Sequence, residues 1–357
     1  MPTLLLDKEK CLRNIERMAQ KATSNQLSFR PHFKTHQSAE IGSWFREFGV
    51  SKICVSSFRM ARYFADAGWK DILVAFPFNP HDLPQLNELS ANTSISILLD
   101  NTDTLAFLDK LKHPIEFYID IDTGYGRTGI KSGNKEEIEK LLASSGKIPG
   151  LEFKGFYCHA GHSYKASANS EKEQIHRRAT GELMNLKQEF ASYSPVVLYG
   201  DTPNCSTQDE FPGIDEITPG NFVFYDLTQI LLGSCCPKQV AVALACTVTG
   251  RYPDRKQLVI HGGGIHFSKE SAQVADLTVF GQVVDGTEEG WCFPGEKVFL
   301  TGLSQEHGLM ENAGVLFEKT RIGNKLYILP VHSCMTANLM KEYQTIRGNV
   351  IKTINSY

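Results

Sequence analysis

The chain has 357 residues, enough for one large domain and a smaller one, and its 41% hydrophobic and 22% charged content is typical of a globular protein. The formal charge of −3 gives no electrostatic reason to expect nucleic acid or an anionic membrane as a partner, so a small molecule is favoured. Nine cysteines without a C-x-x-C pair, no apolar run of about 20 residues and no signal-like N-terminus are what we expect of a cytoplasmic protein.

Strand-like and helix-like segments alternate over the first two-thirds of the chain. The strand-like segments are 28–34, 52–57, 71–77, 94–100, 115–122, 151–160, 195–201 and 216–226. The main helix-like segments between them are 38–48, 58–67, 102–111, 135–143 and 170–190. Several strands are almost continuously apolar, as in parallel strands buried on both faces. This pattern predicts a (β/α)8 TIM barrel with catalytic groups at the C-terminal ends of its strands, and a doubly wound open sheet is the alternative.

The pattern changes after about residue 235, where helical periodicity becomes weak. Strands are predicted at 239–249, 256–261, 296–301 and 325–330, separated by Gly-rich turns. Residues 1–7 are expected to add a strand to this part, and 8–22 to form a helix that leads into the barrel. The predicted domains are therefore a barrel at 8–235 and a mostly β domain at 236–357 that includes 1–7.

The segment Arg30-Pro-His-Phe-Lys-Thr-His36 places Lys34 at the end of the first predicted strand. Phe33, Pro31 and two nearby histidines indicate a desolvated lysine. Desolvation and neighbouring positive charge lower the pKa of a lysine, and its neutral amine then reacts with an aldehyde. A solvent-facing lysine at a strand end is the alternative, and this segment alone does not decide between them.

A glycine-rich segment, Asp122-Thr-Gly-Tyr-Gly-Arg-Thr-Gly129, contains G-x-G-x-x-G after a predicted strand. A dinucleotide-binding loop needs these glycines to open a helix, but Lys131-Ser-Gly-Asn134 separates them from the next one. A loop whose glycines let the backbone approach a ligand and hold Arg127 beside it is therefore favoured. A tight turn with an exposed arginine is the alternative.

Two loops near the last barrel strands carry candidate phosphate-binding groups. Loops after the last two strands of a barrel frequently bind phosphate through backbone N–H groups and hydroxyls. The segments Gly200-Asp-Thr-Pro-Asn-Cys-Ser206 and Thr218-Pro-Gly-Asn221 occupy these places. Their candidate donors are Thr202, Gly220 and Asn221. Ordinary turn chemistry is the alternative, because Gly, Asn and Pro are common in turns.

A possible metal-binding pair, His332-Ser-Cys334, follows the strand predicted at 325–330. Residues i and i+2 of an extended segment point to the same side, so an imidazole and a thiolate can share one metal, and zinc suits that pair. A buried histidine and an inert cysteine are the alternative.

Other histidines have no role that their spacing defines. His159 and His162 follow the sixth predicted strand together with Tyr164, and His307 lies in the β domain. The triplet after His261, Gly262–Gly264, is predicted to form a turn.

Together these motifs resemble the fold-type III pyridoxal-phosphate enzymes with an alanine racemase-like barrel, in particular the D-serine dehydratase and D-threonine aldolase group. The motifs occur in the order of the family and cover nearly the whole chain. They are Arg30-Pro-His-Phe-Lys-Thr-His36, Asp122-x-Gly-x-x-Arg127-x-Gly129, His159-Ala-Gly-His-Ser-Tyr164, Gly200-Asp-Thr-Pro203, Pro219-Gly-Asn-x-x-x-Tyr-Asp226 and Pro330-Val-His-Ser-Cys334. The resemblance implies that pyridoxal 5′-phosphate is bound by Lys34, lined by Arg127 and Tyr164, and held at its phosphate by Thr202, Gly220 and Asn221. It also implies that Zn²⁺ or another divalent metal is bound by His332 and Cys334.

The resemblance further implies the reaction. Dehydratases of the group carry His-x-Cys and D-threonine aldolases carry His-x-Asp, so Cys334 favours dehydration of a β-hydroxy-D-amino acid to a 2-keto acid and ammonia. Lys34 would remove the Cα proton, the metal would bind the β-hydroxyl, and the protein would be a homodimer. A D-threonine aldolase, an amino-acid racemase and a non-catalytic pyridoxal-phosphate carrier are the alternatives. Residues 336–343 replace an aspartate-rich tail of the family, which leaves the choice among D-serine, D-threonine and a 3-hydroxyaspartate open.

Overall fold

A computed structural model describes residues 1–166, 168–287 and 290–356 of the protein. The chain packs as two compact units. The barrel unit comprises Glu16–Lys34 and Ser43–Gly220. The β unit comprises Met1–Ile15, Thr35–Gly42 and the chain from Asn221 onward. The domain limits expected from the sequence, 8–235 and 236–357 with 1–7, stay a prediction.

Eight parallel strands form the wall of the barrel unit. They are β2 (Ser28–Phe29), β3 (Lys52–Val55), β4 (Asp71–Pro77), β5 (Ser94–Leu99), β6 (Ile115–Asp122), β8 (Leu151–His159), β9 (Val196–Gly200) and β10 (Glu216–Ile217). They pair in the order β2-β10-β9-β8-β6-β5-β4-β3, and the short β7 (Ile130–Lys131) lies beside β6. A parallel bridge between His32 and Cys54 joins the two ends of this row, and the Cys54 N–H donates to the carbonyl of Pro31 at 2.9 Å. The predicted (β/α)8 barrel is therefore confirmed, and the open sheet is excluded.

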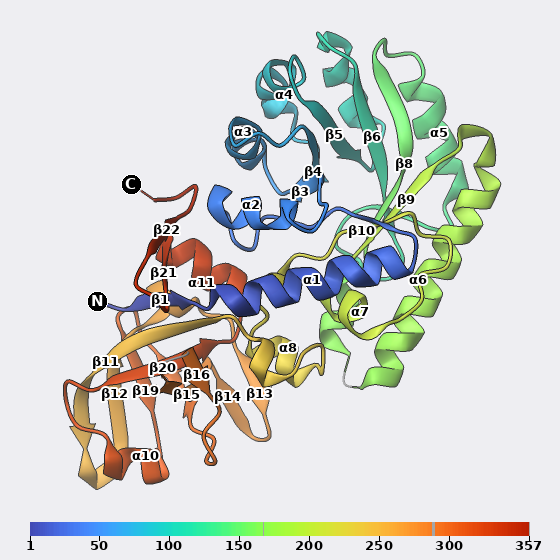
Figure 1. The fold of residues 1–357 in the computed structure, drawn as a ribbon. Coiled ribbons are helices and arrows are strands. Elements are labelled where there is room, and N and C mark those ends of the chain that lie inside the picture. The colour runs from blue at the N-terminus through green and yellow to red at the C-terminus, as the bar shows by residue number, and fades with distance from the viewer. Residues whose placement is uncertain (167, 288–289, 357) are drawn as a thin grey trace. The chain divides into compact units, whose positions relative to one another are not determined.

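Helices lie outside these strands, as Figure 1 shows for α3, α4, α5 and α6. The helices of this part of the chain are α2 (Ala39–Arg46), α3 (Phe58–Asp66), α4 (Leu83–Leu89), α5 (Lys135–Ser145), α6 (Asn169–Glu189) and α7 (Thr202–Thr207). Side chains define where several of them begin. The Ser57 hydroxyl accepts from the N–H of Met60 at 3.2 Å at the start of α3. Residues 102–111, predicted as an ordinary helix, contain the 3₁₀ helix η2 (Asp103–Lys110).

The barrel interior is layered, because side chains along a barrel strand alternate between inside and outside. An apolar middle layer consists of Cys54, Leu73, Leu98, Tyr118, Tyr157 and Leu198. At the N-terminal ends of the strands, the buried Arg30 bonds to Glu216 at 2.5 Å and to Asp71 at 2.6 Å. Two residues beyond the apolar layer, at the catalytic end of such barrels, lie Asp120, His159 and Gly200 in the strands, with Ser56 and Asp100 directly after β3 and β5.

The β unit is built on the long strand β11 (Val242–Tyr252). It pairs with β1 (Thr3–Leu6), β12 (Gln257–His261) and β20 (Lys325–Pro330). The sheet also contains β15 (Gly281–Thr287), β16 (Gly290–Cys292), β17 (Phe299–Leu300), β18 (Gly302–Leu303), β19 (His307–Met310), β21 (Glu342–Thr345) and β22 (Val350–Lys352). Strands β13 (Ala272–Val274) and β14 (Leu277–Val279) form a separate pair.

Helix α1 (Lys8–Ser24) belongs to both units: its residues up to Ile15 are part of the β unit, and those from Glu16 are part of the barrel unit. The β unit also has short helices that the sequence pattern does not indicate. These are α8 (Leu227–Leu231), α9 (Gly264–Phe267), α10 (Gly314–Lys319) and α11 (Ser333–Met340). None of the described helices is both long and apolar enough to cross a membrane.

Candidate active site

Lys34 lies just beyond the point where the barrel closes. Its neighbour Phe33 is fully buried and packs against Phe64 and Trp69, with ring centroids 5.0 and 5.1 Å apart. Lys34 itself lies in the turn that follows the His32 bridge, and its charge acts on two residues of the barrel interior, Cys54 and His159. The lowered pKa expected for Lys34 stays a prediction.

His159, at the end of β8, lies within the electrostatic reach of Lys34. Burial first, and then the charges of Lys34 and Arg127, lower the pKa of His159 well below its usual value. Its imidazole is therefore neutral at neutral pH. The ring centroids of Tyr125 and Tyr164 lie 5.9 and 6.4 Å from that of His159. The structure thus groups His159, whose role the sequence left open, with Lys34, Arg127 and Tyr164, three residues of the predicted cofactor site.

The glycine-rich loop holds Arg127 at this end of the barrel. The Asp122 carboxylate accepts from the N–H groups of Gly124 and Gly126 at 2.9 and 3.0 Å, which fixes the loop. Gly129 has φ +99°, and a Cβ there would lie 3.0 Å from the carbonyl oxygen of Asp120. The next helix, α5, begins only at Lys135, so the loop lacks the helix that dinucleotide binding requires. Arg127 is exposed, 5.2 Å from the ring of Tyr125.

Tyr164 and Thr202 meet beside the start of α7. The Thr202 N–H donates to the Tyr164 hydroxyl at 3.4 Å. Asp201 joins the two segments, since it accepts from the Ser163 hydroxyl at 2.9 Å and from the Asn204 N–H at 2.6 Å. Burial raises the pKa of Asp201 to about 6. The Thr202 hydroxyl is buried and has no hydrogen-bond partner within the described part of the chain, so it fits a ligand oxygen.

Gly220 closes the barrel unit. The residue before it, Pro219, accepts from the N–H of His32 at 2.9 Å, which places this loop at the same end of the barrel as the Lys34 segment. The three cofactor-site candidates Lys34, Thr202 and Gly220 therefore all follow barrel strands at their C-terminal ends.

Asn221 begins the long C-terminal segment of the β unit, Asn221–Tyr357. Its side-chain amide bonds to other residues of that unit. Its Nδ2 donates to Asp226 at 2.7 Å, to the hydroxyl of Ser333 at 2.9 Å and to the sulfur of Cys334 at 3.5 Å. The sequence predicts Asn221 as a hydrogen-bond donor to the phosphate. In the structure its side-chain NH₂ group donates to Asp226, Ser333 and Cys334, so its backbone N–H is the group that we consider for the predicted phosphate contact.

His332 and Cys334 lie at the start of α11, not on the extended segment that the sequence predicts. The chain turns into the helix directly after His332, whose carbonyl accepts from the Thr336 N–H at 3.2 Å. Asp226 holds this turn by accepting from the Ser333 N–H at 3.0 Å. The extended geometry is therefore wrong as the reason for the pairing, although the two side chains do meet.

The His332–Cys334 pair is polarised. Burial alone would lower the pKa of His332 and raise that of Cys334, but the hydrogen bond and charge interaction between them outweigh burial. The pKa of His332 is raised to about 9, and that of Cys334 is lowered. The hydroxyl of Thr35 lies 3.2 Å from the Cys334 sulfur.

A metal fits the His332–Cys334 pair. The imidazolium already stabilises the thiolate as a cation would, and nitrogen with sulfur is a donor set that zinc accepts. Sequence reasoning missed Thr35 and Asp226 as supports of this pair. Thr35 directly follows Lys34, and Asp226 ends the Pro219–Asp226 motif, so both lie inside segments that the sequence analysis already selects.

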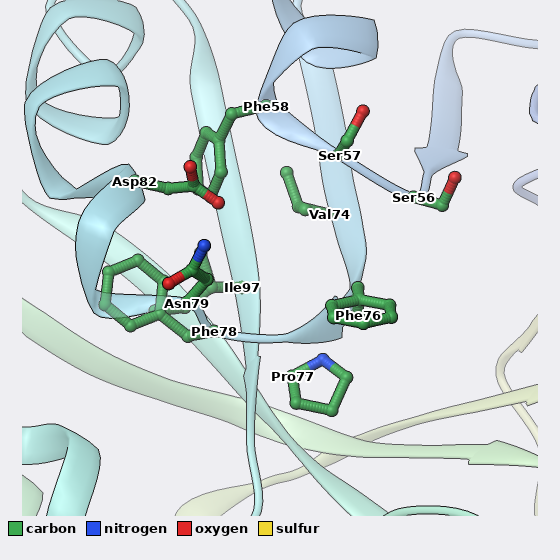
Figure 2. A pocket seen from close by; sticks show the side chains of 10 residues that line it. All are labelled: Ser56, Ser57, Phe58, Val74, Phe76, Pro77, Phe78, Asn79, Asp82 and Ile97. Atoms are coloured by element: carbon green, nitrogen blue, oxygen red, sulfur yellow. The ribbon is translucent and has the colours of Figure 1, made fainter.

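One well-formed pocket of the barrel unit is not this site. Figure 2 shows it beside the C-terminal ends of β3 and β4, with Phe76, Asn79 and Asp82 among its lining residues. Its volume of about 150 Å³ is small for a cofactor, since ligand pockets usually measure about 300–1,000 Å³. None of the predicted site residues lines it.

Two known families of protein domains match this chain. The alanine racemase N-terminal domain family matches residues 6–224, and the serine dehydratase domain family matches residues 241–346. The D-serine dehydratase of Dictyostelium discoideum is 29% identical over 96% of this chain and 92% of its own. The D-threo-3-hydroxyaspartate dehydratase of Delftia sp. strain HT23 is 30% identical over 98% of this chain and 94% of its own.

Solved structures of dehydratases also resemble this chain. The structure of the Delftia dehydratase matches with a TM-score of 0.92 at 26% identity and covers 100% of this chain and 98% of that one. A cysteine-to-alanine variant of a D-threo-3-hydroxyaspartate dehydratase, in the metal-free form, matches with a TM-score of 0.91 at 26% identity and covers 100% of this chain and 98% of that one.

Proposed function

The chain belongs to the D-serine dehydratase family of fold-type III pyridoxal-phosphate lyases, and we propose that it dehydrates a β-hydroxy-D-amino acid to a 2-keto acid and ammonia. The observation that carries the proposal is the polarised His332–Cys334 pair, which provides the His-x-Cys donors of a dehydratase. We propose pyridoxal 5′-phosphate and Zn²⁺, or another divalent metal, as cofactors, and a homodimer as the working form. D-serine, D-threonine and 3-hydroxyaspartate are the candidate substrates.

The barrel residues are proposed to bind the cofactor and move one proton. Pyridoxal phosphate, when bound, supplies an aldehyde for amines and a ring that accepts electrons from Cα. Lys34 would hold that aldehyde, and once the amine of the substrate has displaced it, the free Lys34 amine would take the Cα proton as general base. The buried Thr202 hydroxyl and the backbone N–H groups of Gly220 and Asn221 donate to the phosphate, since loops in these positions of a barrel favour phosphate.

Arg127 and Tyr164 are proposed to line the cofactor, and His159 is proposed to lie near it without adding a positive charge. The neutral imidazole of His159 places an uncharged polar group near the positive charges of Lys34 and Arg127. It therefore adds a hydrogen-bonding group without a third positive charge.

The β unit is proposed to supply the group that helps hydroxide leave. Zinc, when bound, supplies a Lewis acid for the β-hydroxyl of the substrate. Cys334 provides the anionic sulfur, and His332 gives up the proton that its raised pKa retains in the metal-free chain. Thr35 and Asn221 contact the same sulfur and orient it.

The proposal is tested by product analysis. The purified protein with pyridoxal phosphate and zinc is incubated separately with D-serine, D-threonine and D-threo-3-hydroxyaspartate, and keto acid, ammonia, glycine, aldehyde and L-isomer are measured together. We expect keto acid and ammonia, lost with a chelator and in Cys334→Ala but retained in Cys236→Ala, a matched change at an exposed cysteine. Glycine with an aldehyde would instead identify an aldolase, and L-isomer a racemase. No turnover of any substrate would favour a carrier and refute the proposed activity.

A further inference from the structure

Three side chains of the β unit outside the His332–Cys334 pair lie close together. His261 Nε2 is 3.4 Å from a carboxylate oxygen of Glu306, and His266 Nε2 is 4.0 Å from the same oxygen. The three ligand atoms lie within 4.8 Å of one another. The exposed fractions of the side chains of His261, His266 and Glu306 are 38%, 15% and 45%, so the group is anchored but open to solvent.

The backbone builds this group by a close approach of two segments. The N–H groups of Gly262 and Gly264 donate to the carbonyls of Glu306 and Ser304, both at 2.8 Å. A Cβ on Gly263 would lie 2.3 Å from the carbonyl oxygen of Gln305. The glycine triplet that the sequence predicts as a plain turn therefore packs one backbone against another. This packing fixes His261 at the end of β12, His266 on α9 and Glu306 before β19.

We propose that His261, His266 and Glu306 form a second metal site, which binds a divalent transition ion such as Zn²⁺. Two imidazole nitrogens and one carboxylate oxygen are a donor set typical of zinc, whereas Mg²⁺ and Ca²⁺ are bound mainly by oxygen. Three protein ligands leave a fourth position for water or for a ligand from solution. Zinc binds nitrogen and oxygen ligands at about 2.0–2.2 Å, so three ligand atoms within 4.8 Å of one another need only move closer together to share one ion.

The protonation state of His266 is compatible with metal binding, but its present hydrogen bond to Gly263 would have to break. Burial lowers the pKa of His266 and outweighs the opposite effect of Glu306, so the ring is neutral and has a lone pair. In the metal-free chain that lone pair is on Nδ1, which accepts from the Gly263 N–H at 3.2 Å. Metal binding at Nε2 moves the ring proton to Nδ1 and breaks this hydrogen bond. We therefore expect this site to bind zinc more weakly than the His332–Cys334 pair.

The second site is not isolated within the β unit. His266 lies on α9, and the Thr336 hydroxyl of α11 donates to the carbonyl of Phe267 at 3.2 Å. Helix α11 also carries Cys334. A test must therefore measure each site separately.

The test is equilibrium dialysis of the pyridoxal-phosphate-loaded protein against buffered zinc, followed by elemental analysis. We expect Glu306→Gln and His261→Gln each to bind one zinc fewer than wild type. Both side chains are partly exposed, so neither change opens a cavity in the core. The matched control is His307→Gln, because His307 lies opposite His261 in the β12–β19 pair but outside the group, and it should bind as many zinc ions as wild type.

Cys334→Ala separates this inference from the proposed function. Its remaining zinc should show only nitrogen and oxygen neighbours by X-ray absorption, and adding Glu306→Gln should remove that zinc. Equal zinc content in wild type, Glu306→Gln and His261→Gln would overturn the second site, whatever Cys334→Ala shows. Loss of zinc from Glu306→Gln with none lost from Cys334→Ala would support the second site and count against the proposed metal pair.

Discussion

The proposed metal chemistry depends on a negative charge at Cys334. Three groups favour that charge by lowering the pKa of the thiol: the imidazole of His332, the hydroxyl of Thr35 and the amide of Asn221. A thiolate is the form of cysteine that binds a metal, so this environment prepares the ligand before any metal is present. Thr35 is also the residue after Lys34, which links the lysine segment to the metal pair along the chain.

Thr35→Val tests the hydroxyl contact with Cys334. Valine keeps the shape and removes the donor, and a hydrogen bond to a charged group contributes about 1.5–3 kcal/mol. We therefore expect alkylation of Cys334 in the metal-free protein at pH 7 to slow by about tenfold, since less thiolate is present. The measurement is the rate of iodoacetamide labelling of the Cys334 peptide by mass spectrometry.

Thr207→Val is the control for this change, because the Thr207 hydroxyl lies at the end of α7 and donates to the carbonyl of Pro203 at 2.8 Å. Its labelling rate should equal that of wild type. If Thr35→Val also labels at the wild-type rate, the Thr35 hydroxyl does not stabilise the thiolate.

At the scale of elements, Asp226 defines the start of two helices. One carboxylate oxygen accepts from the Gln229 N–H at 3.0 Å and caps α8, and the other accepts from the Ser333 N–H at 3.0 Å at the start of α11. It also accepts from Asn221 at 2.7 Å. A single buried carboxylate therefore fixes the first turn of α8 and the first turn of α11, which carries Cys334.

Asp226→Ala is expected to lower the free energy of unfolding of the β unit by about 2–4 kcal/mol. The change removes two caps, each contributing about 1 kcal/mol, and leaves buried donors unpaired. Urea unfolding followed by circular dichroism measures the loss. Asp209→Ala is the control, because the side chain of Asp209 is almost fully exposed and its contact with Lys21 is long, at 3.9 Å. Equal midpoints for both variants would show that Asp226 does not hold these helices.

The sequence predicts the elements that a local apolar pattern defines. It does not predict the elements whose hydrogen-bond partners lie far away in the sequence. The apolar strands β4 and β6 have the predicted bounds, 71–77 and 115–122. The start of α11 was missed because its cap, Asp226, lies 107 residues away in the sequence. The sequence does not predict the contact between the Asn221 side chain and Cys334 for the same reason, since the two residues are 113 apart in the sequence. Local spacing identifies such residues as candidates but does not reveal which groups they meet.

At the scale of the whole molecule, a buried ionic cluster closes the N-terminal end of the barrel. Arg30 from the β2 segment bonds to Glu216 of β10 and Asp71 of β4, and Lys52 of β3 bonds to Glu216 at 2.6 Å. Burial would raise the pKa of Glu216, but the charges of Arg30 and Lys52 outweigh it and lower the pKa. The cluster joins strands from the beginning and the end of the barrel.

Glu216→Gln is expected to destabilise the protein by about 3 kcal/mol or more at pH 7, because it leaves the buried Arg30 with one fewer counter-charge. A carboxylate whose folded-state pKa is lowered stabilises above its unfolded-state pKa, and that stability is lost as pH falls through the folded-state value. Wild type should therefore lose stability below about pH 4.5, the ordinary value for this group, and the difference from Glu216→Gln should shrink.

Urea unfolding at pH 7 and pH 4 measures both effects. Glu173→Gln is the control, because its pair with Arg177 is exposed and contributes less than about 1 kcal/mol. A Glu216→Gln penalty as small as that of the control would show that the cluster does not hold the barrel closed.

One experiment separates the two proposed roles: removal of the Cα proton by Lys34, and the departure of hydroxide at the metal held by His332 and Cys334. D-serine is incubated in D₂O with wild type, Lys34→Ala or Cys334→Ala, each with pyridoxal phosphate and zinc, and NMR follows α-proton exchange and pyruvate. If Lys34 removes the Cα proton and Cys334 holds the metal that helps hydroxide leave, wild type forms pyruvate, Cys334→Ala exchanges the α-proton without pyruvate, and Lys34→Ala does neither. Pyruvate from Cys334→Ala at the wild-type rate, or exchange retained in Lys34→Ala, would contradict the proposed mechanism.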